Sequence, residues 1–274
     1  MIAETMALTF RALKKWIRNP AAVLPGLFTS IFYLALFGSS FNPANLIPSG
    51  FSSTQISQTF GGAPTYITYL TAGVICLILV FNMAFGGIDL VLDRQLGFLN
   101  TVLTAPIPRA AIFFSGVAQN LVKVMFLAFL TFLIALVIPN GLVLPAGFGV
   151  LNLIGVFGSF ALLGLGLSCV FTALALSVRS IDSLVAIVNF LTLPLIFMSD
   201  ALFPSSSFPD WLKTIANVNP ITKADEAARL LIVNGNLTSS QLSTFANDVL
   251  YLVGVVAILT IIGYFAAEKA LSAQ

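Results

Sequence analysis

Long runs of apolar residues, separated by more polar stretches, dominate the pattern along the chain. The runs cover residues 21–41, 66–88, 110–138, 146–177, 183–203 and 247–267. The hydrocarbon core of a bilayer is about 30 Å thick, and an apolar helix of roughly 20 residues crosses it. Each run is therefore long enough to span a membrane. The pattern predicts an all-α integral membrane protein with six transmembrane helices, built as a single domain over residues 1–274.

The segment before the first run has an amphipathic pattern. From Glu4 to Asn19, one side of a helix would be apolar and the other basic, with Met6, Phe10, Leu13 and Ile17 against Arg11, Lys14, Lys15 and Arg18. Such a helix lies in the membrane interface with its basic side on anionic headgroups, and Asn19-Pro20 ends it. We predict an N-terminal interfacial helix within residues 1–20. The alternative is a charged flank that only precedes the first span.

Basic residues are unevenly distributed between the connecting segments, and this predicts the orientation. With the N-terminus inside, the cytoplasmic stretches carry Arg11, Lys14, Lys15, Arg18, Arg94, Arg109, Arg179 and Lys269, and the outer ones carry Lys213, Lys223 and Arg229. This excess predicts that both termini are cytoplasmic. The outer loop 204–246 contains an Ala-rich segment and Trp211, so we expect short helices at the outer surface before the last span.

The composition excludes several kinds of chemistry. Hydrophobic residues make up 58% of the chain and charged residues only 8%, against about a quarter in a soluble domain. The chain has no histidine, which removes imidazole metal sites and Ser/His catalysis. The net charge of +2 is dispersed, so no nucleic-acid partner is indicated. We therefore expect no catalytic residue and no metal site.

The sequence contains neither a phosphate-binding loop of the Gly-x-x-x-x-Gly-Lys-Ser/Thr type nor a dinucleotide-binding glycine motif. The chain is therefore not expected to bind a cofactor or to be an enzyme by itself. Energy for active transport has to come from a partner or from an ion gradient.

Polar residues inside the apolar runs are candidates for a transport pathway or gate, because ionisable groups at depth are costly. Lys123 lies in the third run, with Gln119 and Asn120 at i−4 and i−3 on the same face. That face looks either into the bundle or across a subunit interface. The alternative is that the helix starts in the cytosol and Lys123 extends to the membrane surface.

The second and fifth runs carry further candidates. Asn82 and Asp89 share one face of the second span. They could line an inner gate, with Arg94 or Arg179 as a partner of Asp89. The alternative is that Asp89 is an ordinary interfacial carboxylate. The fifth span contains Asn189 and ends near Asp200. Pro194 weakens the backbone hydrogen bonding of this span. Such a break is expected at an outer gate, and the alternative is a simple kink without a role.

The cytoplasmic stretch from Asp93 to Arg109 combines moderate polarity with a regular Leu/Phe/Val pattern and a Pro-x-Pro stop. This pattern is typical of a short amphipathic helix with an exposed apolar face, which is a docking surface on the inner side of a membrane protein. The alternative is an interfacial helix that contacts only lipid.

These residues resemble the loop signature of ABC exporter permeases of the type-2 class, in which an acidic-Arg-x-x-Gly run precedes a Leu-rich stretch and Pro-x-x-Arg. The stretch from Leu202 to Leu212, with Ala216-Asn-Val-Asn-Pro220 and Ala227-Ala-Arg229, is similar to the outer motif of that class. The closest resemblance is to small drug-resistance permeases, which carry the Leu-Thr-x-Pro-Ile-x-Arg form of the loop motif.

The resemblance implies a coupling helix over residues 94–106 that sits in a groove of a cytosolic ATP-binding subunit. The residues that would couple to the ATPase are Asp93, Arg94, Gln95, Gly97, Phe98, Leu99, Pro106 and Arg109. The N-terminal helix would be the interfacial connecting helix of the class. Closure of the ATPase dimer would then move the spans as rigid bodies.

The resemblance further implies a second permease, identical or related, that completes an export route for a hydrophobic or amphiphilic substrate such as a drug, an antibiotic, a lipid or a glycan. ATP and magnesium would bind the partner subunit and none would bind this chain. We expect a multi-pass protein of a prokaryotic plasma (inner) membrane. The alternative function is a self-sufficient secondary transporter or channel, a class that usually has buried carboxylates or discontinuous helices at mid-membrane.

Overall fold

The computed structural model describes residues 2–19, 23–40, 62–98, 102, 104, 107–138, 141–205 and 208–272, and within these ranges every regular element is a helix. The helices are α1 (Ile2–Ile17), α2 (Leu24–Ser40), α5 (Tyr66–Phe85), α6 (Ile88–Gln95), α8 (Arg109–Val137), α9 (Val150–Ser177), α10 (Ile181–Phe197), α11 (Asp210–Asn217), α12 (Pro220–Asn234) and α13 (Ser239–Ser272). The prediction of an all-α fold is confirmed for the described residues.

Four helical stretches are long and apolar enough to cross a membrane, namely Tyr66–Gln95, Arg109–Val137, Val150–Ser177 and Ser239–Ser272. They make the chain a multi-pass membrane protein. The other two expected spans correspond to α2 and α10, which are apolar but have 17 residues each, or about 26 Å of helix. The count of six spans therefore stays a prediction.

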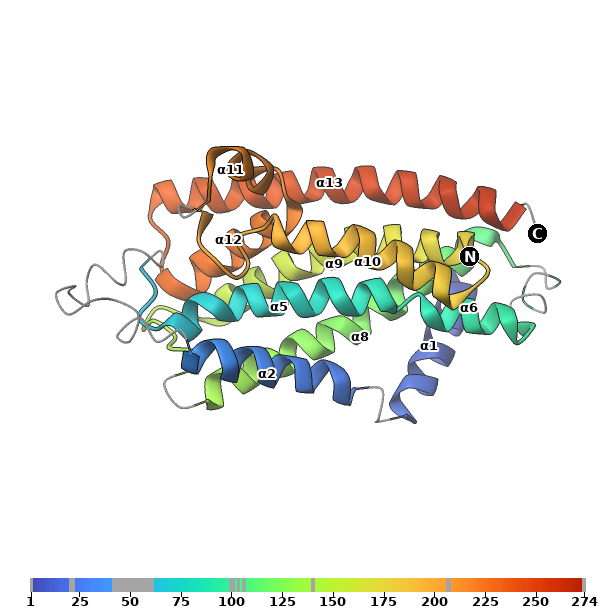
Figure 1. Ribbon diagram of the computed structural model, residues 1–274, viewed down its shortest axis with the longest axis horizontal. Helices are drawn as coiled ribbons and strands as arrows, with labels where there is room; N and C mark the ends of the chain where they lie inside the picture. Colours follow the sequence, from blue (N-terminus) through green and yellow to red (C-terminus); the bar gives the residue numbers. More distant parts are fainter. Residues whose placement is uncertain are drawn as a thin grey trace.

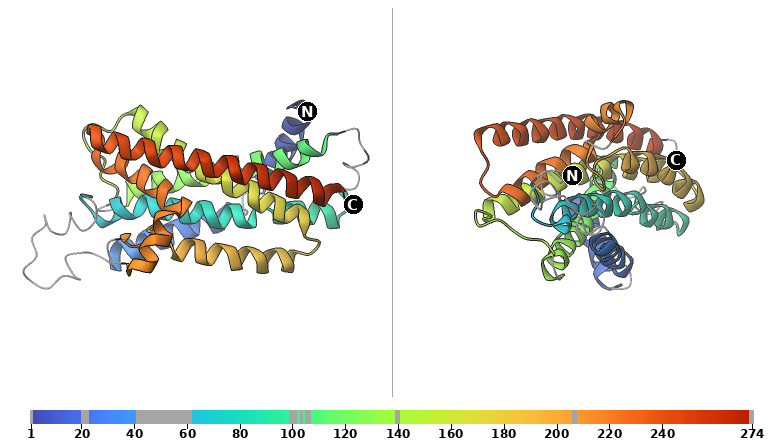
Figure 2. Two further views of the ribbon diagram at one scale, coloured as in Figure 1. Left: turned by 90° about the horizontal axis from the view of Figure 1, so that it is seen from above. Right: turned by 60° about the vertical axis from the view of Figure 1, so that its left-hand side comes forward.

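Both ends of the chain lie at the same end of the helical bundle (Figure 1). The N-terminal helix α1 runs across the direction of the long helices at that end, as Figures 1 and 2 show. Its apolar residues Ile2, Met6, Phe10 and Ile17 are exposed, and none of its residues is buried. This arrangement is that of the predicted amphipathic helix, with an apolar side that a membrane surface can cover.

Helix α5 is the centre of the bundle. Nearly all of its residues from Tyr66 to Ala84 are buried, whereas only 11% of the most apolar stretch of α13 is buried. Helix α13 packs on α9 along one side, and its exposed apolar side is suited to lipid, because water does not favour exposed apolar surface. Thr65 caps the start of helix α5, and its side chain accepts a hydrogen bond from the Thr68 N–H at 3.1 Å.

Helix α5 continues into α6 through a break at Gly86 and Gly87. A Cβ atom at Gly86 would lie 2.6 Å from Oδ1 of Asn120, and one at Gly87 would lie 2.7 Å from the Cβ of Ala175. Only glycine therefore permits this close approach of α8 and α9 to the break. The break redirects the chain before α6 delivers its charged residues to the end that holds both termini.

Helix α10, which contains Pro194, ends partway along the bundle, and α11 and α12 follow beyond its end (Figure 1). Both short helices fall within the expected loop 204–246, and Trp211 on α11 is exposed. The turn after α10 packs directly on α5, because a Cβ atom at Gly73 would collide with the backbone carbonyl of Ala201. This turn carries Asp200 into the protein interior.

Candidate functional site

Helix α1 is attached to α6 by ion pairs. Arg11 Nη1 lies 3.3 Å from Asp93 Oδ2, while Lys15 Nζ lies 3.6 Å from Asp89 Oδ1 and 3.7 Å from Asp93 Oδ1. The two basic residues and the two acidic residues are each four positions apart, so each pair occupies one face of its helix. The sequence therefore places two matching charged stripes where the crossing helix meets the bundle. We call Arg11, Lys15, Asp89, Asp93 and Lys123 the inner charge cluster.

Lys123 extends this cluster into the bundle. Its Nζ lies 2.9 Å from Asp89 Oδ2, and its side chain is 11% exposed, against 41% for Asp89. Lys123 therefore points toward α6. The prediction that Arg94 or Arg179 pairs with Asp89 is wrong. Lys123 and Lys15 pair with this carboxylate, because α8 and α1 face it directly.

Arg94 faces α9 instead. Its guanidinium donates to the carbonyls of Leu176 at 2.5 Å and Val178 at 2.6 Å, where α9 ends. A helix end leaves carbonyl groups without intrahelical partners, and a cation there is also favoured by the helix dipole. Gln95 makes a longer contact of 3.4 Å to the carbonyl of Arg179. Both side chains thus fix the end of α9 against α6.

The helix that holds Asp93, Arg94 and Gln95 stops at Gln95. Gly97 follows with φ of 78°, a left-handed conformation that ends the turn, and the space around its missing Cβ is open. The three residues therefore belong to the end of α6, and a coupling helix starts no earlier than Phe98. Leu99 and Pro106 lie outside the described residues.

Phe98 contacts α1, the helix that runs across the end of the bundle. The guanidinium carbon of Arg11 lies 3.4 Å from the centroid of its ring, within cation–π range. Val102 is buried in a small apolar cluster that includes Leu8 of α1 and Leu271 of α13 among its members. Phe98 and Val102 thus pack against the two terminal helices. Arg109, the first residue of α8, is exposed.

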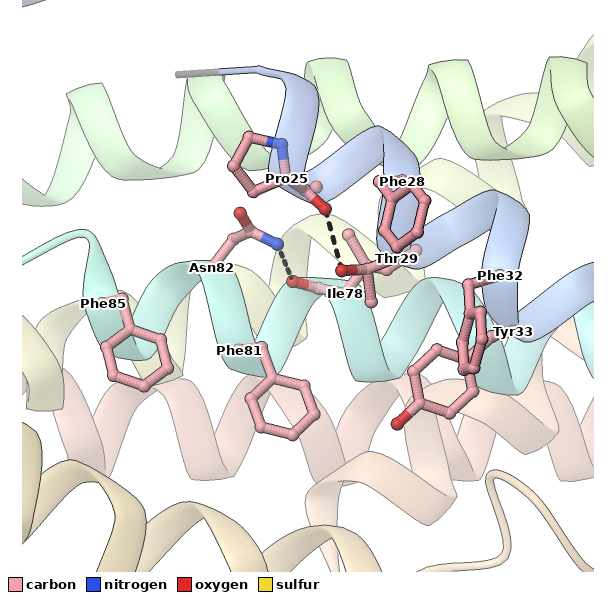
Figure 3. A pocket seen from close by; sticks show the side chains of 10 residues that line it. Pro25, Phe28, Thr29, Phe32, Tyr33, Ile78, Phe81, Asn82 and Phe85 are labelled. Carbon is pink, nitrogen blue, oxygen red and sulfur yellow. Dashed lines mark hydrogen bonds between the residues drawn. The ribbon is translucent and has the colours of Figure 1, made fainter. Parts of the chain in front are cut away.

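A second candidate feature is a groove of about 510 Å³ between α2 and α5 (Figure 3). Its lining is rich in aromatic side chains and comprises Pro25, Gly26, Phe28, Thr29, Phe32, Tyr33, Ile78, Phe81, Asn82 and Phe85. Asn82 donates to the carbonyl of Ile78 at 2.8 Å, and Thr29 donates to that of Pro25. Each of these side chains thus donates to a backbone carbonyl of its own helix. The groove therefore presents aromatic rings with a few polar atoms.

The remaining candidates do not form one site. Gln119 and Asn120 are buried on α8, Asn120 against Gly86, and Asn189 is half-buried on α10. Asp200 lies beyond α10 and pairs with Arg229 of α12, away from the inner charge cluster. The sequence reasoning missed the roles of Lys15 and Arg229. For Lys15, the i,i+4 match between the charged stripes of α1 and α6 was an available signal.

A family model and curated relatives match this sequence. Residues 3–233 match the family model described as ABC-2 type transporter. The chain is 28% identical to a "Putative transport permease ycf38" of Porphyra purpurea over 286 residues, which cover 100% of this chain and 90% of the relative. It is 25% identical over 245 residues to the "Probable doxorubicin resistance ABC transporter permease protein DrrC" of Mycobacterium tuberculosis, covering 87% and 80% of the two chains.

Proposed function

The chain belongs to the ABC-2 type transporter family, and from this membership we propose that it forms the export route of an ATP-driven exporter. The family makes it the membrane permease, which works with a separate ATP-binding subunit. The proposal adds the direction of transport, the substrate class and the coupling residues. ATP and magnesium bind the partner subunit in this scheme.

The observation that carries the proposal is the attachment of the segment after Gly97. Arg11 contacts both Asp93, before the turn, and Phe98, after it. A push on this segment is therefore transmitted to α1 and α6 together. From Asp89 it continues through Lys123 into α8, and from Arg94 it continues to the end of α9. Such a connected set of helices moves as a rigid body when the ATP-binding subunits close.

The ATP-binding subunit docks, in this proposal, on the segment 98–106 and on the exposed residues beside it. Leu96 is 78% exposed and stands at the tip of the α6 turn. An apolar side chain in that position supports a protein contact, because cytosolic water does not favour its exposure. The end of the bundle that holds both termini is therefore proposed to be cytoplasmic, in a prokaryotic plasma membrane.

The groove between α2 and α5 is proposed as one wall of the export route. Its Phe, Tyr, Thr and Asn side chains suit a hydrophobic or amphiphilic substrate, because aromatic rings supply apolar contact and the few polar atoms fix orientation. A second permease, identical or related, would close the open side. The relative named for doxorubicin resistance supports a drug-like substrate.

Transport into inverted membrane vesicles tests the proposal. The chain is produced together with its ATP-binding subunit, and doxorubicin serves as a fluorescent probe. We expect uptake that requires ATP and both subunits, and none when the phosphate-loop lysine of the ATP-binding subunit is substituted. Uptake by the chain alone, driven by an ion gradient, would instead establish a secondary transporter and overturn the proposal.

A further inference from the structure

The end of the bundle opposite the termini contains a buried group of charges. Asp200 follows α10, and Asp225 and Arg229 lie on α12. Their side chains are 3%, 0% and 11% exposed. Arg229 Nη1 lies 3.4 Å from Asp200 Oδ2, and its Nη2 donates to Asp225 Oδ2. The guanidinium carbon lies 3.9 Å from the centre of the Tyr69 ring, which closes the remaining face.

The charges of this group do not balance, because two carboxylates share one guanidinium. Lys223, on the same helix as Asp225 and Arg229, does not supply the missing charge. Lys223 Nζ already lies 2.7 Å from Glu226 Oε2 and 3.2 Å from Asp248 Oδ1, which again places two carboxylates on one cation. The other titratable groups that interact electrostatically with the group are Tyr66, Tyr69 and Cys76 of α5 and Glu226 of α12. They contribute no positive charge.

Two carboxylate oxygens without a hydrogen-bond partner in the described part of the chain also indicate that positive charge is missing from this group. One carboxylate oxygen of each acid, Asp200 Oδ1 and Asp225 Oδ1, is buried without a hydrogen-bond partner among the described residues. An ionised oxygen in this state costs several kcal/mol, so buried carboxyl groups without a matching cation tend to become neutral. Burial raises the pKa of Asp200 to about 6, against the opposing effect of Arg229, and raises the pKa of Asp225 well above its ordinary value.

We propose that Asp200 and Asp225 hold one shared proton at neutral pH, so that this end of the permease contains a proton-binding site. One carboxylate takes up a proton from solvent and becomes a carboxylic acid, and the other stays ionised beside Arg229. The group is then electrically neutral. The proton belongs to the pair, because two strongly coupled acids titrate together. This inference is independent of the direction and substrate of transport.

The site holds the outer turn of α10 in place. The Asp200 N–H donates to Thr222 Oγ1 at 3.3 Å, and the Tyr69 hydroxyl and Arg229 Nη2 both donate to the Asp200 carbonyl at 3.4 Å. Asn219 donates to the carbonyls of Leu195 and Met198, where α10 ends. Loss of the proton would leave an uncompensated negative charge inside this attachment and weaken the contact between α10 and α12.

Infrared spectroscopy of the full chain in lipid nanodiscs at pH 7 tests the proposal. A protonated buried carboxylic acid gives a C=O stretching band that shifts in D₂O. We expect this band in the wild type and the loss of one carboxylic acid component from it in both Asp200→Asn and Asp225→Asn, since Arg229 matches the single remaining carboxylate in each variant. Asp210→Asn, which changes a fully exposed carboxylate on α11, should leave the band unchanged.

Two results would overturn the proposal. The first is a wild-type spectrum without the band. The second is a band that keeps its full intensity in Asp200→Asn, which conserves the shape of the side chain and decides the question even if Asp225→Asn does not fold. Replacement of sodium by choline provides a further check. A spectrum that depends on sodium and shows no carboxylic acid would mean that a cation occupies the site in place of the proton.

Discussion

Lys123 of α8 and Asp89 of α6 form an ion pair of 2.9 Å in which the lysine is nearly buried and the aspartate reaches the bundle surface. Asp89 also meets Lys15 of α1. One carboxylate therefore connects the helix that crosses the bundle end to a helix inside it. This contact is the shortest ion pair of the inner charge cluster, and it gives the buried ammonium group the partner that it needs.

Asp89→Asn should destabilise the protein by about 1–3 kcal/mol. Loss of one partner of a fully buried pair costs about 3–5 kcal/mol, and the partial exposure of Asp89 reduces this value. Thermal unfolding in detergent measures the effect. The matched double variant Asp89→Asn with Lys123→Met removes the unpaired charge and should recover most of the stability. Equal stability of wild type and Asp89→Asn would show that the pair is not important.

Arg94→Ala should lower thermal stability by about 1–3 kcal/mol, because the carbonyls at the end of α9 lose a charged donor. Arg94→Lys should recover only part of this loss, since an ammonium group cannot reproduce the forked geometry of guanidinium. Arg179→Ala is a suitable comparison on the same bundle end. If Arg94→Ala unfolds like the wild type and only ATP-driven transport is lost, Arg94 contacts the partner subunit and does not stabilise α9.

Substitutions of Gly97 should act through the backbone. Its φ of 78° disfavours residues with a branched Cβ by about 1–2 kcal/mol, although the surrounding space is open. Gly97→Val should therefore redirect the segment after the turn and reduce ATP-dependent transport, with membrane insertion intact. Gly97→Asn is the control, because Asn tolerates the left-handed region. Equal transport by the two variants would contradict a conformational role for Gly97.

Much of this architecture could be predicted from the sequence. The apolar runs located the long helices, and the amphipathic spacing located α1. The pairing of Asp89 with Lys123 could not be predicted, because it depends on which helices meet at the break formed by Gly86 and Gly87. The buried position of Arg229 was hidden for a similar reason: a charged residue in an Ala-rich outer segment is typical of a solvated surface, and only the turn after α10 brings Asp200 to it.

Phe81→Ala in the groove between α2 and α5 should raise the doxorubicin concentration required for half-maximal transport by roughly 10-fold, because a lost aromatic contact of about 1.4 kcal/mol has that effect. ATP hydrolysis in the absence of drug should not change. Phe265→Ala on the exposed side of α13 removes the same side chain from a lipid-facing position. The groove is not part of the route if both variants transport doxorubicin equally well.

The most direct test of ATP-driven coupling is the position of residue 104 relative to the ATP-binding subunit. Thr104 is exposed in the segment after Gly97, and both native cysteines are buried, so a Thr104→Cys variant carries one accessible thiol. A short bifunctional thiol reagent should link this thiol to the ATP-binding subunit, with a yield that changes when ATP is added. Ser243→Cys, exposed at the other end of the bundle, should give no such product. Labelling of Thr104→Cys in intact cells by a membrane-impermeant reagent would place the segment outside and contradict the account.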